Sequence, residues 1–138
     1  MDGEVWESTR QTAIKAIRRE RNYILELECY TRLSRDNVSR ISGFSVPRLV
    51  GSDDRLQVIE IKIVTPPNIL DFGKVHFDRR PDYSPETWQE WLDERRELFG
   101  DHWPRVEALM AALSSGYGIY YMDPKPGNIM FGDEQRRD

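Results

Sequence analysis

The order of hydrophobic and polar positions divides the chain into a strand-rich first half and a helical second half. Short apolar runs bounded by turn residues predict four strands, at residues 3–6, 12–17, 46–51 and 56–64. Residues 8–11 would form the turn of an antiparallel hairpin between the first two strands. The fourth strand is nearly all apolar from Val58 to Ile61, which favours a central position in the sheet.

Helical spacing follows in three segments. Apolar residues recur every three or four positions from Arg19 to Leu33, which predicts a helix between the second and third strands. Thr65-Pro66-Pro67-Asn68 is the clearest break in the chain. Beyond it, Ser84-Pro85 predicts the start of a helix that ends near Gly100. Another helix is expected from His102 to Ser115.

The predicted elements give an α+β fold in two parts. Residues 1–64 would form a small antiparallel sheet with one helix, and residues 65–138 a mainly helical part. The aromatic residues of the second part fit packing between its two helices better than an exposed surface; they are Trp88, Trp91, Phe99 and Trp103. The charged run from Asp93 to Arg96 is interpreted as a solvated helix face.

Composition and charge argue against several classes of function. The 138 residues are 38% hydrophobic and 32% charged, with a net charge of -4, which argues against a general binder of nucleic acids or anionic membranes. No apolar run reaches the ~20 residues of a membrane-spanning helix. The single cysteine, Cys29, suits a reducing compartment, so we expect a cytoplasmic protein. His76 and His102 have no partner at ligand spacing, so a zinc site is not expected.

The segment from Tyr121 to Phe131 carries the most specific chemistry. Asp123 is followed by Lys125 and Asn128 in a Pro/Gly-rich turn, which could also reflect turn preferences alone. The spacing resembles the protein-kinase catalytic loop, H-R-D-x-K-x-x-N, although Tyr121 and Met122 replace His and Arg. The resemblance implies that Asp123 accepts the proton of the acceptor hydroxyl, Lys125 steadies the phosphoryl group and Asn128 holds Mg²⁺.

A second resemblance lies near the start of the chain. Gly3, Val5 and the strand Ala13-Ile14-Lys15 are similar to the end of a kinase glycine-rich loop and its lysine strand. Lys15 would then contact the ATP phosphates and pair with a glutamate of the next helix. Glu26 is the preferred partner and Glu28 the alternative. Ordinary surface charges would explain the same residues without any site.

The strand at residues 59–62 resembles the kinase hinge, which binds the adenine edge through its backbone. Glu60 carbonyl and Lys62 amide would be the contacts, while Ile59 would limit the depth of the pocket. Val5, Ala13 and Ile61 would form apolar walls around the base. A plain β-strand accounts for the same pattern.

Two parts of the kinase pattern are not found in their usual places. The 138 residues offer only Gly3 for the phosphate-covering loop, and no Asp-Phe-Gly follows the catalytic loop. Asp71-Phe72-Gly73 precedes that loop, and we interpret it as a loop unrelated to the site. Asp133 is a weaker candidate for the missing metal ligand. The resemblance therefore implies a truncated two-lobe, protein-kinase-like fold that is minimal or degenerate.

Three classes of function fit these observations. The first is an ATP- and magnesium-dependent phosphotransferase, acting alone or completed by another chain or a homodimer. Its acceptor could be a protein or a small molecule, because the Asp-x-Lys spacing resembles Ser/Thr protein kinases and the Pro-Gly-Asn ending resembles aminoglycoside and choline kinases. The second is a pseudokinase that binds nucleotide without turnover, and the third is an interaction or scaffold module.

Overall fold

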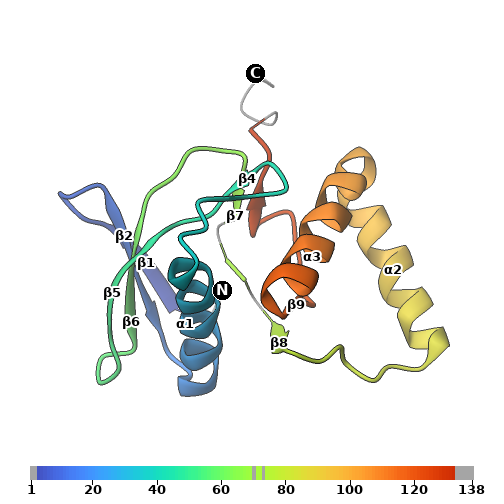
Figure 1. Ribbon diagram of the computed structural model, residues 1–138, viewed down its shortest axis with the longest axis horizontal. Coiled ribbons are helices and arrows are strands. Elements are labelled where there is room, and N and C mark those ends of the chain that lie inside the picture. The colour runs from blue at the N-terminus through green and yellow to red at the C-terminus, as the bar shows by residue number, and fades with distance from the viewer. Residues whose placement is uncertain (1–2, 70, 73, 133–138) are drawn as a thin grey trace.

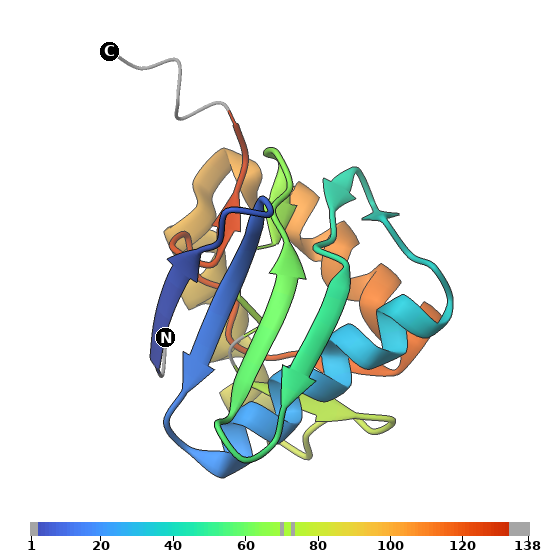
Figure 2. The ribbon, with the colours of Figure 1, turned by 90° about the vertical axis from the view of Figure 1, so that its left-hand side faces the viewer.

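The first part of the molecule is an antiparallel sheet covered on one face by a helix. The computed structural model describes residues 3–69, 71–72 and 74–132. The sheet has the strand order β1-β2-β6-β5, with bounds Gly3–Glu7, Thr12–Ile17, Val58–Lys62 and Leu49–Asp53. Helix α1, Glu20–Arg35, packs against β2 and β5 (Figure 1). Figure 2 shows the four strands in front, with α1 and the rest of the molecule behind them.

Two smaller sheets connect this layer to the helical part. One has the order β10-β7-β4-β3, with bounds Ile129–Met130, Asn68–Ile69, Phe44–Ser45 and Arg40–Ile41. The other pairs β8, Val75–Phe77, with β9, Ile119–Tyr121. In the first of these sheets, β7 pairs with β4 from the first part of the chain and with β10 from the second. These short strands were not evident from the hydrophobic pattern.

The helical part is an antiparallel pair of helices joined by a tight turn. Helix α2, Pro85–Phe99, begins at Ser84, whose hydroxyl accepts a hydrogen bond from the Thr87 N–H. A 3₁₀ turn, η1 (Gly100–His102), leads into α3, Trp103–Tyr117. Phe99 and Trp103 are buried and their rings lie 6.3 Å apart, so these aromatic residues pack within the helical part as expected.

The hydrophobic core runs without interruption from α1 to the helical part. Phe72 is fully buried and makes edge contact with Tyr30 of α1, at a ring separation of 5.3 Å. On its other side Phe72 lies 5.9 Å from the ring of Tyr121 in β9. Burial of these large rings is the dominant favourable term here, and it joins the two parts of the molecule.

The predicted fold class is confirmed. The structure is α+β, with the four main strands and three main helices near their predicted positions. Helix α1 extends from residue 20 to 35, two residues beyond the predicted end, and β5 begins at Leu49 rather than Val46. Within the described part of the chain, no helix has the length and apolar character needed to cross a membrane.

Arg32 links α1 to the helical part at the surface. Its guanidinium donates to both carboxylate oxygens of Asp78, at 2.8 and 2.9 Å, and to the Tyr117 carbonyl at 3.1 Å. The same group stacks on the Phe77 ring, with 4.4 Å between the guanidinium carbon and the ring centroid. Hydrogen bonding to Arg32 lowers the pKa of Asp78. A bidentate pair of this kind fixes geometry as well as charge.

Replacing Asp78 with Asn should lower the melting temperature at neutral pH and do little in acid. The folded-state pKa of Asp78 lies below its ordinary value of 3.8, so its contribution is complete above that value and is lost as pH falls through the lowered pKa. Thermal unfolding of both proteins across this range measures the difference. A gap that stays constant down to pH 2 would show that the Asp78 charge does not stabilise the fold.

Candidate functional site

A buried ion pair joins the sheet to α1. Lys15 Nζ donates to Glu26 Oε1, and the two side chains are only 2% and 5% exposed. Tyr30 hydroxyl lies 3.4 Å from the same ammonium. Burial raises the pKa of Glu26 above its ordinary value, and the nearby Lys15 charge opposes that rise. Glu28, the alternative partner, instead pairs with Arg32 on the surface.

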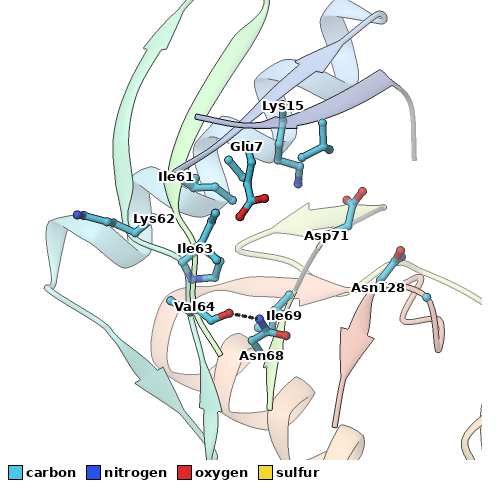
Figure 3. A pocket seen from close by; sticks show the side chains of 14 residues that line it. Glu7, Lys15, Ile61, Lys62, Ile63, Val64, Asn68, Ile69, Asp71 and Asn128 are labelled. Carbon is cyan, nitrogen blue, oxygen red and sulfur yellow. Dashed lines mark hydrogen bonds between the residues drawn. The ribbon is translucent and has the colours of Figure 1, made fainter. Parts of the chain in front are cut away.

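Lys15 lies at one end of an apolar cavity of about 430 Å³. Figure 3 shows Ile61, Ile63 and Val64 on one side of it, with Lys15, Asp71 and Asn128 together at the other. Val5, Ala13 and Ile69 complete the apolar lining. The volume and the separation of apolar from polar groups are typical of a small-molecule site.

A second, polar pocket of about 230 Å³ adjoins the first and shares Lys15, Asp71 and Asn128 with it. Further charged and polar side chains line this pocket; they are Arg19, Asn22, Glu26, Lys74, Asp123 and Lys125. Together the two pockets form one elongated site that is apolar at one end and charged at the other. Such a site can accept a ligand that has an apolar part and a charged part.

The turn that carries Asp123 is held by α2. Trp91 Nε1 donates to the Met122 carbonyl at 3.0 Å, and Arg95 donates to Asp123 Oδ1 at 3.2 Å. Lys125 Nζ lies 3.1 Å from the other oxygen, Oδ2, so the carboxylate has a cation on each side. The interpretation of Arg95 as part of a solvated face is wrong, because its side chain is buried against this turn.

Asp71 lies inside the site, so the expectation that Asp71-Phe72-Gly73 is unrelated to it is wrong for Asp71. Its N–H donates to the Asn128 carbonyl at 3.3 Å, and its own carbonyl accepts from the Tyr121 hydroxyl at 2.5 Å. The residue is 8% exposed and borders both pockets. The reason is the pairing of β7 with β10, which places the residues after β7 beside the catalytic-loop turn.

Three residues predicted for nucleotide binding lie elsewhere or are engaged in the fold. Gly3 borders neither pocket, and a Cβ there would lie 1.7 Å from the Ala16 carbonyl oxygen, so β-sheet packing requires this glycine. Glu60, predicted to contact adenine through its carbonyl, borders neither pocket and pairs with Ile14 of β2 and Gly51 of β5 within the sheet. Lys62 N–H donates to the Arg48 carbonyl at 2.9 Å, so the expected adenine contact through this amide is wrong.

Asp71 and Asn128 carry the side-chain oxygens that could serve as ligands for a cation. The described residues contain no group of three or more His, Cys, Asp or Glu side chains that could hold a metal ion. Mg²⁺ bound with nucleotide needs fewer protein ligands, because phosphate oxygens and water complete its shell. The carboxylate and amide at the junction of the two pockets fit that requirement. Asp133 and Gly73 lie outside the described residues.

Comparisons with models of protein families, with curated proteins and with solved structures found no match to this chain. The kinase resemblance therefore depends on the residues and the geometry described above.

Breaking the Lys15–Glu26 pair from one side should cost about 3–5 kcal/mol of unfolding free energy, because the remaining charge is buried without its partner. We expect this for Lys15→Met and for Glu26→Leu, whereas the double variant should be more stable than either. Urea denaturation measures all three. Glu28→Gln, at a surface pair, should cost no more than about 1 kcal/mol. Additive losses in the double variant would contradict this account.

Proposed function

We propose that this chain is a minimal kinase-like phosphotransferase that binds ATP with Mg²⁺. The observation that carries the proposal is the meeting of Lys15, Asp71 and Asn128 where an apolar cavity joins a polar one. The apolar end suits a nucleobase, and the charged end suits a polyphosphate. A cytoplasmic location, where both ligands are abundant, is part of this proposal.

The three residues shared by the two pockets have distinct roles in the proposal. Lys15, oriented by Glu26, would bind phosphate oxygens as a fixed positive charge. Asp71 and Asn128 would hold Mg²⁺, which neutralises charge on the phosphates during transfer. In kinases this metal-binding carboxylate belongs to an Asp-Phe-Gly motif that follows the catalytic loop. In this proposal Asp71 takes the same role, although it precedes the catalytic loop in the sequence.

Asp123 would act as the base at the polar end. The acceptor hydroxyl oxygen forms a bond to the γ-phosphorus as the bond to the leaving ADP oxygen breaks, and the hydroxyl proton passes to an oxygen of Asp123. Arg95 is buried and holds Oδ1, whereas the Lys125 side chain, the partner of Oδ2, is 58% exposed. Movement of Lys125 to a phosphate would leave Oδ2 available for the proton.

One observation favours a pseudokinase as the second candidate. Both oxygens of Asp123 contact cations, so neither oxygen is open to an acceptor hydroxyl while both contacts are in place. In that case nucleotide binds at the same cavity but phosphoryl transfer does not occur. The two candidates differ in turnover and agree on binding, so binding must be measured separately from release of the γ-phosphate.

Magnesium should strengthen ATP binding through Asp71. A ligand present at about 100 times its dissociation constant adds roughly 2.7 kcal/mol to stability, which thermal unfolding detects easily. We expect MgATP to stabilise the protein more than ATP alone, and Asp71→Asn to remove most of the magnesium effect. Asp82→Asn, at an exposed carboxylate outside both pockets, is the matched control. A magnesium effect of equal size in both variants would exclude Asp71 as a ligand.

Replacing Asp123 with Asn should abolish release of the γ-phosphate while preserving MgATP binding. Asparagine keeps the shape of the side chain but cannot accept the proton, and general-base catalysis typically contributes 10²–10⁴-fold. Turnover is followed as ADP formation, and affinity by calorimetry on the same samples. Unchanged turnover in Asp123→Asn would remove this residue from the mechanism. Undetectable turnover in the unaltered protein, with intact binding, would favour the pseudokinase.

A further inference from the structure

Two cations of the polar pocket have no role in the proposed transfer of phosphate from ATP. Arg19 and Lys74 line this pocket together with Asp123, and neither of them borders the apolar cavity. The three residues that both pockets share are assigned to MgATP. Arg19 and Lys74 therefore belong to the part of the site that contains the proposed base and that a nucleobase in the apolar cavity does not reach.

The first of these cations is placed by α1. Arg19 is the N-cap of the helix, and Asn22 and Glu26 follow it at intervals of three and four residues. Residues at this spacing share one helix face, and all three line the polar pocket. Because Glu26 is fixed by its ion pair with Lys15, the same face of α1 presents Arg19 and Asn22 to the pocket.

The second cation is placed by the pairing of β8 with β9. Val75, which follows Lys74, pairs with Tyr121, and the Lys74 carbonyl accepts a hydrogen bond from the Met122 N–H at 2.9 Å. The backbone of Lys74 is thus fixed beside the residue that precedes Asp123. An arginine from the helix and a lysine from the sheet therefore line the same pocket as the proposed base.

The sign of the charge in this part of the pocket favours one class of acceptor. Among the described residues of the lining, the acids Glu26 and Asp123 form ion pairs, and Asp71 is assigned to Mg²⁺. The charged groups of the lining that remain are Arg19 and Lys74, and both are positive and exposed to a ligand. Two cations near the acceptor position attract a negatively charged acceptor and repel a positively charged one.

We propose that the phosphoryl acceptor is a small hydroxyl compound with a carboxylate or phosphate group of its own, and that Arg19 and Lys74 bind this group. This inference rests on the proposed function, because it assumes that MgATP occupies the rest of the site. The acceptor hydroxyl oxygen bonds to the γ-phosphorus, the electron pair of the breaking bond stays on the ADP oxygen, and the proton passes to Asp123. Carboxylate and phosphate oxygens both accept hydrogen bonds from guanidinium and ammonium groups. The acceptor is small because the pocket of about 230 Å³ also holds the phosphates of ATP.

The test measures the binding of three hydroxyl compounds to the protein saturated with Mg²⁺ and a non-hydrolysable ATP analogue. Glycerol 3-phosphate and glycerate are anions, and choline is a cation. Because the analogue fills the γ-phosphate position, an added anion must bind elsewhere in the pocket. We expect calorimetry at low ionic strength to detect binding of at least one of the two anions and no binding of choline. Tighter binding of glycerol 3-phosphate would indicate a phosphorylated acceptor, and tighter binding of glycerate would indicate a hydroxy acid.

A double variant tests the two cations directly. Arg19→Gln combined with Lys74→Gln should weaken binding of the anion at least ~10-fold, the effect of roughly one hydrogen bond to a charged group. The affinity for the ATP analogue should stay within about twofold, because neither residue contacts it in this proposal. The matched control combines Arg21→Gln with Arg79→Gln, which removes the same charge at exposed positions outside both pockets. Each single substitution is measured in the same way where a double variant does not fold.

The outcomes separate this proposal from the one on which it rests. An equal loss of anion binding in the two double variants would overturn it, because the effect would then come from net charge alone. A large loss of affinity for the ATP analogue in the Arg19 and Lys74 variant would overturn it too, because these residues would then bind nucleotide phosphates. Choline binding as tight as that of the anions, or no anion binding beside a bound analogue, would also overturn it and leave the nucleotide site standing. No binding of the analogue at all would overturn the proposed function and this inference together.

Discussion

The geometry of the candidate site depends on the buried ion pair between Lys15 and Glu26. Removing two charges from water costs several kcal/mol for each ion, and apolar residues of similar size would fill the same space at no greater cost. The pair is therefore weak as a source of stability but strong as a positioning device. Because side chains alternate along a strand, the register of β2 between β1 and β6 directs Ala13 and Lys15 to one face. Both side chains line the cavity, and Glu26 holds the Lys15 ammonium in place there.

A second constraint brings together residues that lie far apart in the sequence. The pairing of β7 with β10 joins residues 68–69 to residues 129–130, and Asp71 then lies beside Asn128. The buried ring of Phe72 anchors this segment between Tyr30 and Tyr121. Chemistry that needs a carboxylate near an asparagine depends on their distance in space, and either order along the chain can satisfy it.

Sequence patterns predicted the long elements because each repeats its period several times. Helix α1, the Ser84 cap of α2 and the strand with Lys15 fall in this class, and resemblance to a known loop indicated Asp123 and Asn128. The pairing of β7 with β10 could not be predicted, since two-residue strands show no alternation of apolar and polar residues.

The burial of Arg95 was not predicted, because the residue lies in a run of four charged residues. Its four-residue spacing from Trp91 and Phe99 nevertheless indicates that the three side chains share one helix face. The hydrogen bond from the Lys62 N–H to the Arg48 carbonyl depends on the register between neighbouring segments, which the sequence of one strand does not specify.

The two cations at Asp123 differ in a way that matters for the proposed chemistry. Arg95 is buried and packs against Trp91, which holds it near Oδ1. Lys125 is more than half exposed, and an exposed ion pair contributes little free energy. A polyphosphate in the polar pocket carries more negative charge than one carboxylate and would draw Lys125 away from Oδ2. Nucleotide binding would then free Asp123 Oδ2 from Lys125, so that Asp123 could accept a proton only when the site is occupied.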